Sequence, residues 1–259
     1  MRPYGVVAAA AAAVLLAADG VPRPEAPRIN VGGIVNAVSN RPAPDNFVSP
    51  GAIISIYGTG LADETREVRA SDLIHGLLPE SLAGVTVFFG TEPAPLLYIS
   101  PLQINAQVPV SLHPGEWEVR VRLKQLEGGD RVVVRPYSPG LFPVARHTDG
   151  TVVDRSAPAR PGEYILFFGA GYGPTRPQLL SGELAPPEPV WMTARVEAKI
   201  GDIPLVPEDV YYGGLAPGFA GLYQFNLRVP AGAPAGELEV LVKVDEYWSQ
   251  PGVRIPVER

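Results

Sequence analysis

The chain has 259 residues, no cysteine and a formal net charge of −6. Without cysteine it contains no disulfide, so each domain must be stabilised by burying apolar surface in a core of its own. The acidic balance and the lack of a basic stripe argue against nucleic acid as a partner, since phosphate binding relies on clustered lysine and arginine.

The N-terminus has the pattern of an export signal. Arg2 precedes an alanine-rich apolar run from Val6 to Ala18, and Ala18 and Gly20 are small residues at the positions that a signal peptidase reads. The run is shorter than the roughly 20 apolar residues of a spanning helix, which disfavours the alternative of an N-terminal anchor. We therefore predict a signal peptide over residues 1–20, a linker over 21–33, and a secreted, cell-surface or periplasmic protein with no membrane span after signal removal.

Most of the remaining chain consists of short runs that are rich in valine, isoleucine, tyrosine and phenylalanine. These runs alternate apolar and polar residues and are bounded by turn-forming residues, a pattern that predicts β-strands over 52–57, 85–89, 103–108, 117–123, 131–134, 164–168, 196–200, 222–229 and 238–244. The 30 prolines and 28 glycines leave little room for helices. We expect the range 62–75 to be a loop with at most one turn.

One long stretch of sequence occurs twice. Residues 50–60 (PGAIISIYGTG) return as residues 161–171 (PGEYILFFGAG), an offset of 111 positions. The strand that begins at Gln103 returns at Gln224 with an offset of 121, so the second copy carries ten extra residues between Pro204 and Gln224. The repeated motif residues are Gly58, Gly60, Gln103 and Asn105 in the first copy and Gly169, Gly171, Gln224 and Asn226 in the second.

A repeat of this length indicates tandem domains, because solenoid repeats run roughly 20–50 residues. We predict an all-β protein of two tandem immunoglobulin-like β-sandwiches over 34–140 and 161–259. In the Gln-x-Asn strand, Ile104, Ala106 and Val108 share the inward face. The connecting segment 141–160 contains Leu141 and Phe142, so we expect it to pack between the domains and hold them as a fixed pair with limited hinge motion.

Longer motifs in both halves resemble a known family. They are residues 78–85 (LPESLAGV), 93–105 (PAPLLYISPLQIN), 158–162 (PARPG), 171–174 (GYGP) and 213–224 (GGLAPGFAGLYQ). Together they resemble the Solibacter-type uncharacterised C-terminal domain, a module of secreted acidobacterial proteins, over about 34–257. Each half separately resembles the immunoglobulin-like IPT/TIG domain. The resemblance implies a secreted β protein and implies no activity.

No set of residues predicts catalysis, a metal site or a cofactor. The sequence Gly169-Ala170-Gly171-Tyr172-Gly173 follows a strand, but prolines follow it in place of the helix that a phosphate-binding loop requires. The chain has three histidines, each in a predicted loop and without a cysteine, histidine or carboxylate at metal-ligand spacing. Glu116 and Glu118 share a strand face and recur in the second copy, which favours a solvated surface over an active site. We predict no enzyme, although distant residues brought together by the fold remain an alternative.

Binding is the function class that remains. The ten-residue insertion lies in a glycine-containing segment with four aromatic residues, Tyr211, Tyr212, Phe219 and Tyr223, which can form a platform for sugar rings or a protein hot spot. The structural alternative is that Tyr223 ends a strand and Phe219 fills an interdomain groove. Gln103, Asn105, Gln224 and Asn226 invite the same two interpretations, ligand contact or satisfaction of loop backbone groups. We expect a structural, adhesive or protein-interaction role, with polysaccharide binding through the domain 2 aromatics as the alternative.

Overall fold

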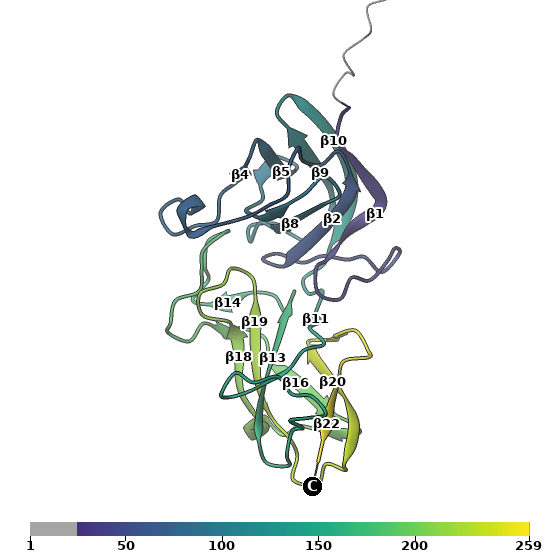
Figure 1. Ribbon diagram of the computed structural model, residues 1–259, viewed down its shortest axis with the longest axis vertical. Coiled ribbons are helices and arrows are strands. Elements are labelled where there is room, and N and C mark those ends of the chain that lie inside the picture. The colour runs from purple at the N-terminus through teal and green to yellow at the C-terminus, as the bar shows by residue number, and fades with distance from the viewer. Residues whose placement is uncertain (1–24, 259) are drawn as a thin grey trace, which may run out of the picture.

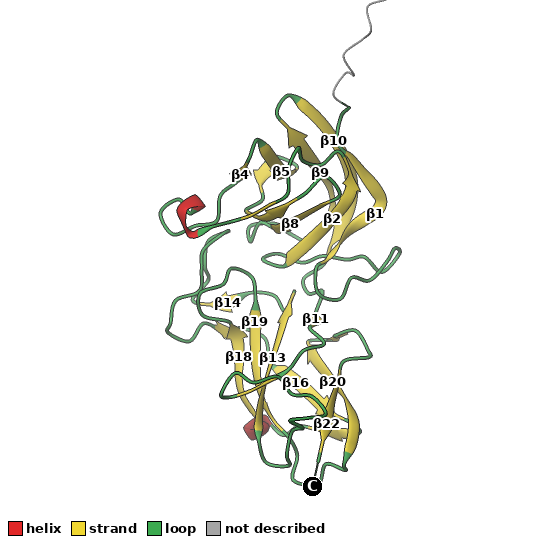
Figure 2. Ribbon diagram, viewed as in Figure 1, coloured by secondary structure: helices red, strands yellow, loops and turns green. Residues whose placement is uncertain are grey.

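The computed structural model describes residues 25–258, so the predicted signal peptide lies outside the described residues. The chain forms two tandem immunoglobulin-like β-sandwiches that lie end to end (Figure 1). Helical structure in the described part is limited to two single turns, η1 (Ala70–Asp72) and η2 (Pro207–Asp209) (Figure 2). Within residues 25–258, no helix has the length and apolar character needed to cross a bilayer.

The first sandwich consists of two facing antiparallel sheets. One sheet has the order β1 (Arg28–Asn36), β2 (Ile53–Thr59), β8 (Gln103–Gln107), β7 (Leu96–Ile99), β3 (Arg66–Glu67). The other has the order β10 (Leu126–Val134), β9 (Gly115–Leu123), β5 (Val85–Phe89), β4 (Ser81–Leu82), with β6 (Glu92–Pro93) paired to β5.

The second sandwich repeats this plan. Its first sheet has the order β11 (Gly140–Leu141), β13 (Tyr164–Ala170), β19 (Tyr223–Arg228), β18 (Val210–Leu215), β15 (Trp191–Met192), β14 (Thr175–Arg176), with β12 (Arg146–His147) paired to β13. Its second sheet has the order β17 (Ile203–Pro204), β16 (Val196–Ile200), β20 (Gly236–Val244), β21 (Tyr247–Trp248), with β22 (Arg254–Val257) paired to β20. The nine predicted strands are all present.

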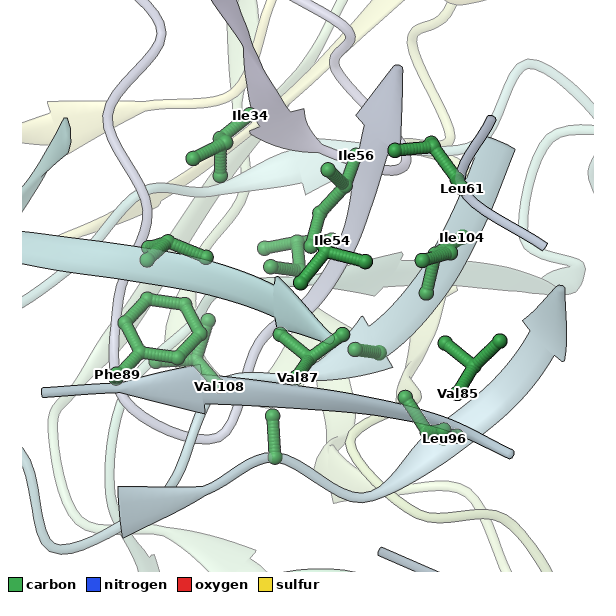
Figure 3. Packing of buried hydrophobic residues seen from close by; sticks show 14 of the residues in the cluster. Ile34, Ile54, Ile56, Leu61, Val85, Val87, Phe89, Leu96, Ile104 and Val108 are labelled. Atoms are coloured by element: carbon green, nitrogen blue, oxygen red, sulfur yellow. The ribbon is translucent and has the colours of Figure 1, made fainter. Parts of the chain in front are cut away.

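Each sandwich has its own apolar core, and the residues that face it are those that strand alternation predicts. In the first, Ile54 and Ile56 of β2 and Ile104 of β8 meet Val87 and Phe89 from the opposite sheet (Figure 3). The second core contains a comparable set of buried side chains from both sheets, among them Ile165, Phe167, Phe225, Leu227, Val240 and Val242. Two separate cores explain how a chain without disulfides supports two domains.

The duplicated glycines occupy equivalent positions. A Cβ atom on Gly58 would lie 2.1 Å from the carbonyl oxygen of Arg28 in the neighbouring strand, and one on Gly169 would lie 2.3 Å from that of Gly140. The glycines two residues later, Gly60 and Gly171, both have positive φ, at 63° and 85°. In each copy, therefore, the strand passes too close to its neighbour for any side chain and then turns through a conformation that favours glycine.

Two predicted boundaries need correction. The first strand, β1, begins at Arg28, inside the range 21–33 that the sequence analysis assigns to a linker. The connecting segment 141–160 contributes β12, and β11 ends within it; both pair with β13, so this segment belongs to the second sandwich. These strands were not predicted because they join the edges of sheets through backbone hydrogen bonds, and backbone pairing leaves little pattern in the side chains.

The two sandwiches are joined by buried polar side chains. The Asn36 amide donates hydrogen bonds to the carbonyl oxygens of Ser138 (2.7 Å) and Ala170 (3.2 Å). The Gln107 side chain accepts a hydrogen bond from the backbone N–H of Gly182 (2.6 Å). Both side chains are buried, so the bonds connect the halves away from water.

Candidate binding surfaces

The repeated Gln-x-Asn motif forms the same hydrogen bond on the outer face of each sandwich. The Gln103 amide nitrogen donates to Asn105 Oδ1 at 2.8 Å, and the Gln224 amide nitrogen donates to Asn226 Oδ1 at 2.8 Å. These side chains are half-buried on their strands and bond to one another, which differs from one of the two interpretations, that they satisfy loop backbone groups. Each pair therefore presents an ordered strip of amide groups on a sheet surface.

A β-bulge lies beside each amide pair. In the first sandwich Tyr98 pairs with Asn105 and the register shifts at Leu97. In the second, Tyr212 pairs with Asn226 and the register shifts at Tyr211. Leu97 and Tyr211 are therefore structural equivalents, as are Tyr98 and Tyr212. The copies share a backbone and differ in the side chain that the bulge carries, which is aliphatic in the first and aromatic in the second.

The first candidate surface is a groove between the sandwiches with a volume of about 760 Å³. Its floor includes the outer face of β7 and β8, and its walls include a first-sandwich loop and a second-sandwich loop. We call it the interdomain groove, and its lining is mostly apolar: Ile53, Glu67, Val68, Arg69, Ala70, Leu73, Leu78, Leu97, Tyr98, Gln103, Asn105, Phe142, Leu184, Gly218, Phe219, Ala220 and Leu222.

The inserted residues of the second copy build one wall of the interdomain groove. Tyr98 and Gln103 are five positions apart, whereas their equivalents Tyr212 and Gln224 are twelve apart, so seven of the ten extra residues lie in this loop. The loop carries Phe219, whose side chain is 56% exposed. It approaches the first sandwich so closely that a Cβ on Gly221 would lie 2.5 Å from the Gly51 carbonyl oxygen.

The second candidate surface is a shallow hollow of about 350 Å³ on the outer face of β18 and β19. We call it the aromatic hollow, and it is lined by Pro187, Pro189, Trp191, Tyr211, Tyr212, Pro217, Gln224 and Asn226. Tyr211 is 69% exposed and Trp191 is 48% exposed. The aromatic hollow thus combines two accessible rings with the second amide pair.

The four predicted binding aromatics do not form one surface. Tyr211 lies in the aromatic hollow, while Phe219 lines the interdomain groove but stays 56% exposed, so it does not fill the groove as the structural alternative expected. Tyr212 is only 8% exposed because the Trp191 ring covers it, with ring centroids 4.9 Å apart. Tyr212 nevertheless contributes to the lining of the hollow.

The prediction that Tyr223 offers a binding face is wrong. Its side chain is 3% exposed, its ring packs against Tyr172, and its hydroxyl donates a hydrogen bond to the Gly173 carbonyl. Burial raises the pKa of the Tyr223 phenol well above its ordinary value. The physical reason is strand alternation, since Tyr223 shares the inward face of β19 with Phe225 and Leu227.

Trp191 and Tyr98 line the two surfaces but are not among the residues predicted from the sequence. Trp191 comes from β15, a two-residue strand, and reaches the surface of β18 by pairing with Gly214. Because Pro187 and Pro189 precede it, the sequence around Trp191 shows no alternating strand pattern and does not predict that Trp191 lies on a sheet. Tyr98 could have been found by aligning the two copies across the bulge, because both copies place a tyrosine opposite the asparagine.

Neither surface assembles a catalytic set. Among residues 25–258 there is no group of three or more histidine, cysteine, aspartate or glutamate side chains that could hold a metal ion. The ionisable residues that line the interdomain groove are Glu67, Arg69 and Tyr98, and those that line the aromatic hollow are two tyrosines. The surfaces are suited to contact and hydrogen bonding.

No protein-family model matches the sequence, and no curated protein matches it. The resemblance to the Solibacter-type domain stays a prediction. Three solved structures are similar to parts of the fold. SGBP-B of the Bacteroides ovatus mixed-linkage glucan utilization locus, in complex with a mixed-linkage heptasaccharide, matches 83% of this chain at 11% identity and a TM-score of 0.33. The plexin A4 extracellular region matches 93% at 13% identity and a TM-score of 0.30, and the BSP domain of a biofilm associated protein matches 82% at 13% identity and 0.28. The chain spans 45%, 19% and 28% of these three proteins, respectively.

Proposed function

We propose that the chain is a non-enzymatic extracellular module that binds a segment of a partner protein in the interdomain groove. The observation that carries the proposal is the composition of the groove walls. Both sandwiches contribute apolar side chains, and the loop that distinguishes the second copy places a largely exposed phenylalanine, Phe219, beside them. The export signal predicted for residues 1–20 supports an extracellular location.

The chemistry of the groove favours a polypeptide ligand. Protein hot spots are aromatic or aliphatic anchors in partly enclosed pockets, and the half-buried Leu97 and Leu222 beside Phe219 provide such a pocket. Glu67 and Arg69 lie at the same groove and can pair with either charge on a ligand. Because the domains are joined by buried hydrogen bonds, the groove is formed before the ligand arrives, which lowers the entropic cost of binding.

Selection from a displayed random peptide library tests the proposal. We expect the protein to select peptides with apolar anchor residues, and we expect Phe219→Ser to weaken their binding by about tenfold or more. Tyr211→Ser is the matched control because it removes a largely exposed aromatic residue outside the groove. Failure to select any peptide, or equal binding by the Phe219→Ser variant, would contradict the proposal.

A second candidate function is carbohydrate binding. A separate observation favours it, namely the two exposed rings and the amide pair of the aromatic hollow on the second sandwich. A carbohydrate bound in the aromatic hollow would leave the interdomain groove available for a protein segment, because the two sites share no lining residue.

A further inference from the structure

The aromatic hollow has rings that are held in place before any ligand binds. The Trp191 ring packs on the Tyr212 ring at an interplanar angle of 63° in an edge-on arrangement. The Tyr212 hydroxyl in turn donates a hydrogen bond to the Leu215 carbonyl at 2.7 Å. Gly214 permits this packing, since a Cβ there would lie 2.7 Å from the Tyr212 hydroxyl oxygen. Trp191 therefore loses little side-chain entropy on binding.

The second exposed ring is also supported. Tyr211 is the extra residue of the β18 bulge, which turns its side chain outward. Its ring lies 5.7 Å from the ring of Tyr164 on β13, centroid to centroid. The two accessible rings thus rest on two buried or half-buried rings, which fixes their orientation on the sheet surface.

Polar groups that can bind a ligand line the same hollow as the two exposed rings. The bond between the two amides uses the Gln224 amide nitrogen and Asn226 Oδ1. Within residues 25–258, the side-chain amide nitrogen of Asn226 and the side-chain oxygen of Gln224 have no hydrogen-bond partner. One donor group and one acceptor group therefore face the same hollow, which matches ligands whose hydroxyl groups both donate and accept.

The charge of the aromatic hollow limits the ligand class. None of its eight lining residues carries a charge, unlike those of the interdomain groove. An anionic polymer would find no cationic partner in this hollow, and the whole chain carries a formal charge of −6. An uncharged ligand loses no ionic hydration on entering such a site, so a neutral ligand fits best.

We infer that the aromatic hollow binds a neutral polysaccharide of β-linked pyranose sugars. In such sugars equatorial hydroxyl groups leave the ring faces apolar, so the faces stack on Trp191 and Tyr211 while the ring-edge hydroxyls reach Gln224 and Asn226. A shallow, open surface accommodates an extended chain. The inference rests on the second candidate function and does not depend on occupation of the interdomain groove.

The first sandwich supplies the internal comparison. It has the same amide pair and the same bulge, but the bulge residue is Leu97 in place of Tyr211. The first pair has no counterpart of the platform that Trp191 and Tyr211 form, because the aromatic residues that line the groove with it are Tyr98, Phe142 and Phe219, of which only Tyr98 comes from the first sandwich. The two copies therefore provide matched variants, with Asn226→Ala in the proposed site and Asn105→Ala at the equivalent position outside it.

Native affinity electrophoresis tests the inference, with hydroxyethyl cellulose, glucomannan or xylan in the gel and polygalacturonate as the anionic comparison. We expect at least one neutral polymer to retard the full-length mature protein and polygalacturonate to have no effect. Tyr211→Ala and Trp191→Ala should each weaken binding about tenfold or more, and Asn226→Ala should weaken it about threefold or more. Tyr211 is largely exposed, so its variant is expected to fold even if the Trp191 variant does not.

Two control variants give the test its specificity. Asn105→Ala and Trp248→Ala should bind as the unaltered protein does, because Asn105 lies in the interdomain groove and Trp248 on β21 of the opposite sheet. Retardation by none of the neutral polymers would overturn the inference, as would full binding by Tyr211→Ala. Loss of binding in Asn105→Ala or Phe219→Ser, with Tyr211→Ala unaffected, would place the sugar in the groove and also overturn it. Peptide selection tests the interdomain groove separately. A protein that selects no peptides would contradict peptide binding in the groove but not polysaccharide binding in the aromatic hollow.

Discussion

Gly58 and Gly169 have no room for a side chain at the same place in the two sandwiches. Their positions on β2 and β13 bring each within reach of a carbonyl oxygen on the adjacent edge strand. The carbonyl belongs to the backbone, so it cannot move aside as a flexible side chain would. The recurrence of this contact explains why the motif keeps glycine in both copies.

Replacing either glycine should destabilise its own sandwich. We expect Gly58→Ala and Gly169→Ala each to lower the free energy of unfolding by about 1–3 kcal/mol through steric overlap. Urea denaturation measures the change. Gly232→Ala is the control, because a Cβ at Gly232 meets nothing within 4 Å. Equal stability of the Gly58→Ala and Gly232→Ala variants would show that the close approach has no energetic cost.

At the scale of elements, a histidine fastens the connecting segment to the second sandwich. His147 on β12 donates from Nδ1 to Glu163 Oε1 at 2.6 Å and from Nε2 to the Ala157 carbonyl at 3.0 Å. The Ala157 carbonyl and an ionised Glu163 carboxylate both accept hydrogen bonds, so this arrangement favours the form of His147 that has a proton on each ring nitrogen. The hydrogen bond to Glu163 is the main cause that raises the pKa of His147 above 6.5.

This arrangement predicts a pH-dependent contribution to stability. A raised folded-state pKa means that the contribution is fully present below the unfolded value of 6.5 and is lost as pH rises through the folded pKa. We expect the difference in unfolding free energy between the unaltered protein and His147→Gln to be largest in acid and to shrink as pH increases. Urea denaturation at several pH values checks this. A His147→Gln difference that grows with pH would refute the assignment.

For the whole molecule, the decisive feature is the junction between the sandwiches. Asn36 at the end of β1 uses both atoms of its amide: the nitrogen donates to Ser138 and Ala170, and Oδ1 accepts from the backbone N–H groups of Val38 and Ser39. The Gln107 side chain also uses both atoms of its amide: the nitrogen donates to the Gly51 carbonyl oxygen, and Oε1 accepts from the backbone N–H of Gly182. A buried network whose groups are paired on both sides favours one relative orientation of the domains.

Solution scattering should therefore fit a single elongated arrangement. We expect Asn36→Ala to broaden the distribution of interdomain distances and to cost about 1–3 kcal/mol, because it leaves buried backbone groups unpaired. Asn30→Ala changes an exposed asparagine of the same strand and should leave the scattering curve unchanged. An ensemble of widely varying separations in the unaltered protein would contradict the prediction of a fixed pair.

The sequence alone determined the all-β class, the duplication and the inward face of each repeated strand. These follow from local properties: period-two alternation, the distribution of glycine and proline, and a repeat that preserves register. Alternation even implies that Tyr223 faces inward with Phe225, although the aromatic content of its segment suggested a binding role.

The tertiary structure decided which outward-facing rings are accessible. Tyr211 and Phe219 lie near each other in the sequence but belong to different surfaces, and Tyr212 is covered by Trp191 from a distant two-residue strand. Likewise, β1 and β12 became strands by pairing with sheet edges. Alternation fixes the face of a strand on which a side chain lies, but its exposure depends on what other segments place over that face. That cover is set by long-range packing, which no local pattern encodes.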